Sequence, residues 1–260
     1  REKTKDALAF STRGIDGKEE IFTLAYRELE TVVSKVPLEE FASEEIQRKA
    51  REDLNWIKEK ALIHEGVIED AMRKNNKILS LIPMKFGTIF KEKTRLKETL
   101  NKDYSRIKEA LERIRGKQEW SVKIYLKNRE KFERVIKEKN EAIKENEKKI
   151  ASLPEGIAYF MEEELTEVIS KEADKELNNI IEGLFESLRK QAVASTKNKI
   201  LEKELTGRRE PMILNSAYLI PDEKTEDFKK DAERLNQEIQ AKGLYLEYSG
   251  PWPAYNFTSY

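Results

Sequence analysis

Few residues in this chain have the chemistry of a catalytic group. The sequence contains a single histidine, His64, and no cysteine, which excludes sites that need two imidazoles or a thiolate. Histidine titrates near neutral pH and can act as a general base. His64, however, has no neighbouring serine or cysteine nucleophile in a recognised pattern, and it lies on an apolar helical stripe. We therefore interpret it as a hydrogen-bonded core histidine.

Other motifs with catalytic or ligand-binding associations are weak. Ser105–Lys108 and Ser187–Lys190 match the Ser-x-x-Lys pattern of some acyl-enzymes, but such matches arise by chance in lysine-rich helices. Gly14–Gly17 is too short for a phosphate-binding loop and is interpreted as a tight turn. The carboxylates lack the spacing of a calcium loop, so we interpret them as solvated helix faces. We expect no catalytic residues, no cofactor and no metal.

The composition restricts the class of partner. The chain has 50 basic and 50 acidic residues, so its formal net charge is zero. A general nucleic-acid binder needs a basic excess to displace counterions from phosphates, so we expect no nucleic-acid partner. No window approaches the roughly eighteen apolar residues of a membrane span. The absence of cysteine and of a signal-peptide pattern favours a soluble, cytoplasmic protein.

Strand signals in the first half of the chain predict a β-hairpin. Residues 21–26 and 31–36 are β-branched and aromatic runs separated by a short gap, and Pro37 ends the second run. Residues 78–90 also have strand character. A proline and a glycine interrupt that run, which favours an edge strand, a bulge or a bend.

Helical periodicity is strong in the same half. Apolar residues recur every three or four positions from Ser43 to about Ala71, and again across residues 92–115. His64 lies on the first of these stripes. Gly116 is placed to end the second helix.

The second half predicts a long helical hairpin between strands. Residues 120–126 alternate apolar and polar side chains, as a half-buried strand does. Charged segments with a thin apolar seam then cover about 128–205, with a Pro/Gly turn at 153–156, which indicates an antiparallel coiled-coil-like hairpin. The remaining elements are a strand at 212–220, a helix at 228–239 and a strand at 244–248.

These elements predict an α+β protein in which small sheets are covered by helices. We expect two domains, covering residues 1–117 and 118–260, with the helical hairpin in the second. The final segment differs in composition, because residues 248–260 carry no charge and five of the thirteen are aromatic. Such a segment either packs on its own domain or binds a partner.

This final segment resembles the closing signature of a known family. Residues 246–257 (Leu-Glu-Tyr-Ser-Gly-Pro-Trp-Pro-Ala-Tyr-Asn-Phe) resemble the Gly-Pro-Trp-Pro-Pro-Tyr-x-Phe end of the gas vesicle protein F/L family, with Ala254 in place of the second proline. Further blocks match in order, at residues 82–90, 119–125, 154–159 and 212–219. The family's first apolar strand is represented only by residues 7–10. These blocks do not separate the F members from the L members.

The resemblance implies an accessory protein of gas vesicle assembly. Family members have two α+β domains with ferredoxin-like sheets and a coiled-coil element in the second. They bind the main shell protein and other accessory proteins during nucleation, without catalysis. The resemblance thus implies a cytoplasmic location and association with the vesicle during assembly.

The tail aromatics Trp252, Tyr255 and Phe257 are the candidate partner-binding residues. The competing interpretation is that they pack against their own domain and lock the last strand. Two other function classes stay open. One is a coiled-coil scaffold unrelated to shell binding, and the other is an enzyme that uses His64 or a carboxylate pair.

Overall fold

The chain divides into two compact units. The computed structural model describes residues 10–74 and 77–258. Unit 1 comprises Arg1–Glu119 together with Pro251–Tyr260, and unit 2 comprises Trp120–Gly250. The expected division placed the C-terminal tail in the second domain, whereas the tail belongs to unit 1. Residues 7–9, part of the segment interpreted as a remnant first strand, lie outside the described residues.

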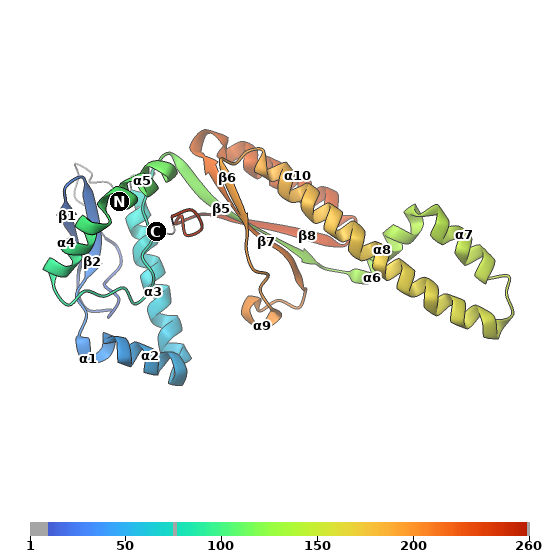
Figure 1. The fold of residues 1–260 in the computed structure, drawn as a ribbon, viewed down its shortest axis with the longest axis horizontal. Helices are drawn as coiled ribbons and strands as arrows, with labels where there is room; N and C mark the ends of the chain where they lie inside the picture. Colours follow the sequence, from blue (N-terminus) through green and yellow to red (C-terminus); the bar gives the residue numbers. More distant parts are fainter. Residues whose placement is uncertain (1–9, 75–76, 259–260) are drawn as a thin grey trace. The chain divides into compact units, whose positions relative to one another are not determined.

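Unit 1 combines a β-hairpin, a short ribbon and several helices (Figure 1). The predicted hairpin is confirmed: strands β1 and β2 are antiparallel and Tyr26 pairs with Leu29, so the turn is shorter than expected. The elements are β1 (Ile21–Tyr26), β2 (Leu29–Ser34), α1 (Leu38–Phe41), α2 (Ser43–Glu52), α3 (Leu54–Met72), β3 (Arg73–Lys74), β4 (Lys77–Ile78), α4 (Lys93–Lys102) and α5 (Tyr104–Ile114).

Each long helix predicted in unit 1 is divided in two by an aspartate. Asp53 separates α2 from α3, and its carboxylate accepts a hydrogen bond of 3.0 Å from the Trp56 amide. Asp103 lies between α4 and α5 but its side chain caps no amide of α5. A short acceptor side chain such as that of Asp53 satisfies an amide that the following helix leaves unpaired. The apolar period continues across both breaks, which is why periodicity alone predicted single helices.

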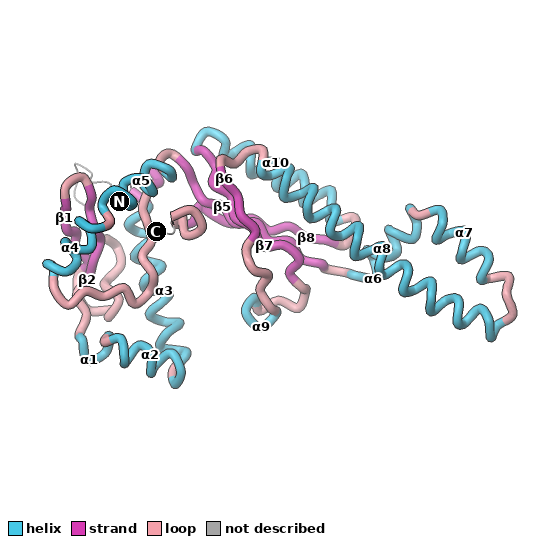
Figure 2. Tube along the Cα trace, viewed as in Figure 1, coloured by secondary structure: helices cyan, strands magenta, loops and turns pink. Residues whose placement is uncertain are grey.

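The strand predicted at residues 78–90 is wrong beyond its first residue. Only Lys77–Ile78 pairs, with β3, and the rest is a loop (Figure 2). Pro83 cannot donate to a strand ladder, and Gly87 has a φ of +82°, a conformation that ends extended structure. Among the described residues of unit 1 the sheets are two-stranded, so the ferredoxin-like sheet expected for the first domain is not found there.

Unit 2 is built around a four-stranded sheet in the described part of the chain, with strand order β6-β7-β5-β8. The connections follow a β-α-β-β-α-β sequence. Its elements, of which β5 begins and β8 ends in unit 1, are β5 (Lys117–Leu126), α6 (Arg129–Lys139), α7 (Glu141–Ile150), α8 (Glu155–Arg189), β6 (Ala194–Lys197), α9 (Lys203–Thr206), β7 (Met212–Pro221), the 3-10 turn Asp222–Lys224, α10 (Thr225–Gln240) and β8 (Leu244–Trp252).

The predicted helical hairpin is shorter and more interrupted than expected. Its second arm ends at Arg189, not near residue 205, and β6 follows. Its first arm is two helices, because the Asn140 side chain accepts hydrogen bonds from the amides of Ala142 and Ile143 and starts α7. Both α6 and α7 contact α8. Ile143, Ile150 and Leu165 form a small apolar cluster between α7 and α8.

The main core of unit 2 lies between one face of the sheet and the helices α8 and α10 (Figure 1). Val122 and Ile124 of β5 are fully buried, as are Tyr218 of β7 and Phe228 of α10. Side chains from alternate strand positions and from helical stripes therefore meet in one layer. Throughout the described residues, every helix is either too short or too rich in charge to cross a membrane.

The turn between α10 and β8 requires a glycine at position 243. Its φ is +83°, and an added Cβ would lie 2.8 Å from the Asn128 carbonyl oxygen. We expect Gly243→Ala to destabilise the protein by on the order of 2 kcal/mol, because both the backbone and the contact become strained. Urea unfolding of the purified variant measures the change.

Gly183→Ala is the matched control. Gly183 lies inside α8 and is exposed, with open space where a Cβ would be. Alanine should stabilise the protein by about 0.5–1 kcal/mol, because alanine loses less backbone entropy in a helix. Equal effects of the two substitutions would contradict the steric argument.

Candidate functional site

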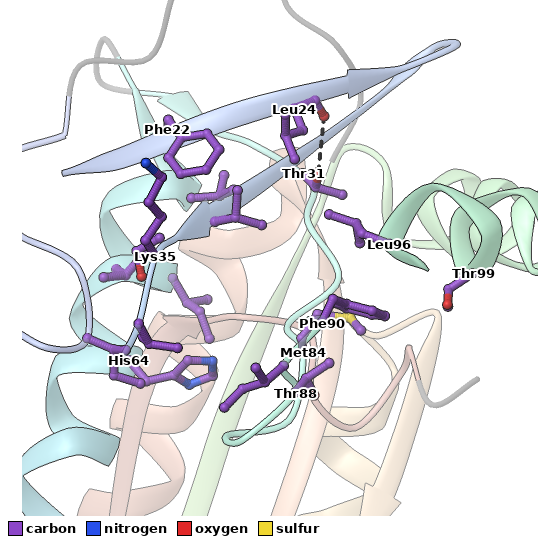
Figure 3. A pocket seen from close by; sticks show the side chains of 18 of the residues that line it. Phe22, Leu24, Thr31, Lys35, His64, Met84, Thr88, Phe90, Leu96 and Thr99 are labelled. Carbon is purple, nitrogen blue, oxygen red and sulfur yellow. Dashed lines mark hydrogen bonds between the residues drawn. The ribbon is translucent and has the colours of Figure 1, made fainter. Parts of the chain in front are cut away.

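A large apolar cavity lies within unit 1 (Figure 3). Its volume is about 590 Å³, the size of many ligand pockets. Phe22 and Leu24 of β1 approach it from one side, and Met84 and Phe90 of the loop after β4 approach it from another. Leu96 of α4 also contributes to the wall. The lining is mostly hydrophobic, so the cavity suits an apolar occupant.

Helix α3 forms another wall of this cavity. His64, Val67, Ile68 and Ala71 all line it. Their spacing of three and four residues places them on one helical face. Ile68 and Ala71 also belong to a small apolar cluster with Leu81, so the cavity wall is continuous with the core of unit 1.

Polar contacts at the hairpin turn fix the position of β1 and β2. Arg27, in the turn, has a φ of +53°, and its guanidinium lies 4.6 Å from the Tyr104 ring centroid. The Glu28 carboxylate accepts hydrogen bonds of 2.8 Å from Lys108 and 3.1 Å from the Tyr104 hydroxyl. Lys108 thereby lowers the pKa of Glu28. These groups are exposed, so they orient the turn more than they stabilise it.

Hydrogen bonds also hold the loop after β4, which forms the opposite wall. The Leu79 amide donates to the Met72 carbonyl at 2.7 Å, and the Ser80 hydroxyl donates to the Ile114 carbonyl at 3.3 Å. Further along, the Thr88 hydroxyl donates to the Lys85 carbonyl at 2.7 Å. The loop is therefore tied to α3 and α5 at its start and closed on itself near its end.

The structure places His64 in the cavity wall rather than in a packed core (Figure 3). Its ring packs edge-on against Phe86, with centroids 5.9 Å apart. Within the described part of the chain, this aromatic contact takes the place of the expected hydrogen bond. Burial lowers the pKa of His64 below its ordinary value of 6.5, so the imidazole is neutral at pH 7.

Several other polar groups at the cavity have partners elsewhere, and the lining also includes the charged residues Glu30, Lys35, Lys91 and Glu92. The hydroxyls of Thr31, Thr88 and Thr99 donate to main-chain carbonyls at 3.0, 2.7 and 3.1 Å. Lys93 lies 5.5 Å from the centroid of the Phe22 ring, as a cation–π pair. His64 therefore shares the cavity with threonines whose hydroxyls bond to the backbone. This arrangement fits binding better than nucleophilic chemistry.

Among the described residues there is no group of three or more histidine, aspartate or glutamate side chains that could hold a metal ion. Ser105–Lys108 lies in α5 and Ser187–Lys190 lies at the end of α8, on charged helices as the sequence predicted.

The aromatic tail folds back onto unit 1. The Tyr255 hydroxyl donates to the carboxylate of Glu65 on α3, and burial together with this contact raises the pKa of Tyr255. Trp252 and Tyr255 remain 36 % and 42 % exposed, and Phe257 is half-buried. These contacts favour packing of the tail on its own unit. They also leave part of two aromatic rings accessible.

A buried carboxylate holds the tail at its middle. Glu119 is only 4 % exposed, and it accepts hydrogen bonds of 3.0 Å from the Asn256 amide and 2.6 Å from the Asn256 side chain. Burial raises the pKa of Glu119 to about 7, although both Asn256 donors favour the ionised form. Sequence reasoning missed this residue as an anchor, since nothing in a lone glutamate before a strand reveals its burial.

The cavity was also missed, because its walls come from separate elements. The apolar block at residues 82–90 is the signal that could have indicated the cavity. Because that block was interpreted as a strand, its side chains were expected in a sheet instead. Two of the blocks on which the family resemblance rests contribute to unit 1: residues 82–90 supply part of the cavity wall, and residues 251–257 of the last block supply the tail.

Comparison with known proteins decides the family. The family model described as "Gas vesicle synthesis protein GvpL/GvpF" matches residues 1–259. The chain belongs to the GvpL/GvpF family. It is 25 % identical over 237 residues to gas vesicle protein L of Streptomyces sp. (strain CB03234), covering 90 % of this chain and 81 % of the relative. It is 24 % identical over 254 residues to gas vesicle protein F1 of Halobacterium salinarum, covering 97 % and 88 %.

Solved structures of this family share the fold. The crystal structure of GvpF from Anabaena sp. PCC7120 matches with a TM-score of 0.72 at 18 % identity, covering 99 % of this chain and 95 % of that one. GvpF from Microcystis aeruginosa matches with a TM-score of 0.65 at 19 % identity, covering 100 % and 96 %. The fold is therefore that of a GvpL/GvpF protein, mixed in helix and sheet.

Glu119 should make the stability of unit 1 depend on pH. The folded pKa of Glu119 is about 7 and exceeds the ordinary value of 4.5. Its contribution to the free energy of unfolding is therefore fully present below pH 4.5 and is lost as the pH rises through 7. The loss is on the order of 3 kcal/mol. In Glu119→Gln this decline should disappear, as measured by urea unfolding at several pH values. A decline of unchanged size in the variant would contradict the assignment.

His64 should make the stability of unit 1 depend on pH in the opposite direction. Its folded pKa lies below 6.5, so the unfolded chain binds more protons and stability falls as the pH drops below 6.5. We expect His64→Phe to lose this acid-side decline while the contribution of Glu119 is unchanged. Thermal melting between about pH 5 and pH 7 checks the prediction. Glu119→Gln is measured in parallel, so that the pH dependence due to His64 is separated from that due to Glu119.

Proposed function

We propose that this chain is an accessory protein of gas vesicle assembly, acting in the cytoplasm and without catalysis. It binds the main shell protein and other accessory proteins during nucleation. Membership of the GvpL/GvpF family supports the vesicle role. The observation that carries the binding role is the apolar cavity of unit 1, because it offers a protected surface to an apolar segment of another protein.

A physical argument links this cavity to shell handling. A shell subunit that must present an apolar face to a gas space would aggregate in water before assembly. A partner that covers part of that face would keep the subunit soluble. This chain is 38 % charged with zero net charge, so the complex would expose a solvated surface without attracting other charged molecules strongly.

Release of the shell subunit would come from competition. The sequence carries no nucleotide-binding loop, so no hydrolysis step within this chain drives release. Contacts between shell subunits at the growing edge would instead replace contacts with the cavity. This requires moderate affinity, which a mostly apolar cavity would provide.

The tail residues Trp252, Tyr255 and Phe257 are proposed as a second contact with the shell protein. The partly exposed rings of Trp252 and Tyr255 support this role, and aromatic side chains are frequent anchors at interfaces. The same tail also packs on unit 1 through Asn256. Tail and cavity therefore need separate variants in any binding experiment.

The alternative is a scaffold that works through the helical arm α6–α8 alone, independently of the shell protein. The arm favours this alternative because α8 extends beyond the core of unit 2 and packs there against α7 and α6. Such a scaffold would bind other proteins and leave the shell protein unbound.

A pull-down of the main shell protein by the full chain tests the proposal. Leu38 and Met84 line the cavity and are 51 % and 38 % exposed, so Leu38→Asp with Met84→Asp should place charge in the cavity without unfolding unit 1. We expect this double variant to lose at least about tenfold of the binding, because a buried apolar contact becomes an unpaired charge.

The matched tail variant is Trp252→Ser, which removes aromatic surface and keeps the contacts of Tyr255 with Glu65 and of Asn256 with Glu119. Circular dichroism and melting must show that both variants are folded. Binding lost only in the tail variant would move the docking site from the cavity to the tail. If the unaltered chain fails to bind the shell protein, the shell-handling role is wrong and the scaffold becomes the better account.

A further inference from the structure

A second apolar surface lies on the first half of α8. Large apolar side chains are exposed there although the helix has a packed side. Ile157, Phe160, Met161 and Val168 are 55 %, 68 %, 39 % and 50 % exposed. Their spacing of three, four and seven residues places them on one face of the helix. We call these four residues the α8 stripe.

The stripe is distinct from the face by which α8 packs in the arm. Leu165 is buried against Ile143 and Ile150, and Ala158 and Ile169 lie beside it. At about 100° per residue, Leu165 and Ile169 lie roughly a quarter-turn or more from the centre of the stripe. Packing within the arm is therefore satisfied without the stripe, which remains an unpartnered face in the described structure.

The charge around the stripe is strongly one-sided. Residues 155–170 contain five glutamates and no lysine or arginine, in a chain whose total charge is zero. Glu164 lies within the stripe, and Glu163 and Glu167 lie along one edge at helical spacing. All three side chains are exposed. Their carboxylates form an acidic border to an apolar surface, and Glu167 at its end also pairs with Lys171 at 3.5 Å.

We propose that the α8 stripe is a docking site for a basic amphipathic helix of a partner protein. Apolar residues of that helix would pack on Ile157, Phe160 and Val168. Its lysine or arginine residues would pair with Glu163, Glu164 and Glu167. This is the helix-on-helix mode in which anchors recur every three or four residues and flanking charges select the partner. The site lies in unit 2 and does not depend on the cavity of unit 1.

The acidic border disfavours the other simple occupants. Two copies of this chain packed stripe to stripe would bring two sets of glutamates together, and like charges at an interface are repelled. An anionic membrane surface would repel the same border. A basic partner instead neutralises the charge as it covers the apolar residues, so both interactions favour the same complex.

The binding experiment uses a designed probe. A synthetic helical peptide of about 18 residues, with leucines on one face and lysines on the others, is labelled and titrated with the full chain. A second peptide has glutamate at each lysine position. We expect the lysine peptide to bind and the glutamate peptide to bind at least about tenfold more weakly, with the difference shrinking as salt rises from about 50 to 500 mM.

Two variants locate the site. Ile157→Ser with Phe160→Ser should weaken binding of the lysine peptide by about tenfold or more, because two apolar anchors are lost. The matched control is Leu54→Ser with Leu62→Ser on α3, which removes leucines that are 63 % and 73 % exposed and should leave binding unchanged. Glu163→Gln with Glu164→Gln and Glu167→Gln should weaken binding and reduce its salt dependence.

Clear outcomes would overturn the proposal. Unchanged binding in the stripe variant would place the peptide elsewhere, and equal binding of both peptides would refute the basic partner. Sedimentation showing that the chain self-associates, and that the stripe variant does not, would make a second copy the occupant. Because these measurements use a designed peptide, they succeed or fail independently of the pull-down with shell protein.

Discussion

The supply of apolar side chains is the constraint on which the rest of this structure depends. Charged and apolar residues each make up 38 % of the chain, so most helices can bury only one narrow stripe. Unit 2 concentrates its apolar residues between one sheet face, α8 and α10. Unit 1 distributes them around an open cavity. The helical arm is left with a thin seam, and its other faces meet water.

This distribution leaves apolar surfaces of two different kinds accessible. The cavity is concave and mostly apolar, although Glu30, Lys35, Lys91, Glu92 and Lys93 also line it, which suits an apolar segment that carries a few polar groups. The α8 stripe is convex and has an acidic border, which suits a basic amphipathic helix. The two surfaces therefore fit partners of different chemistry.

Polar residues lie where the predicted long helices divide. Asp53, Asp103 and Asn140 lie where a single apolar period is divided between two helices. The apolar spacing on either side of these residues is continuous, so periodicity predicted long helices and did not reveal the breaks. Similarly, residues 194–197 lie in a charged context that resembles the preceding helix. They form a strand because the edge of β7 is available to pair with them.

The sequence by itself determined the β-hairpin, the helical stripes, the last strand and, through ordered blocks, the family. These features depend on local periodicity, turn residues and motif order, which are properties of the linear sequence. Only the tertiary structure decided that His64 lines a cavity, that Glu119 is buried beneath Asn256, and that the α8 stripe faces water. Those outcomes depend on which distant segments meet, and a residue's burial follows from its neighbours in space rather than from its neighbours in sequence.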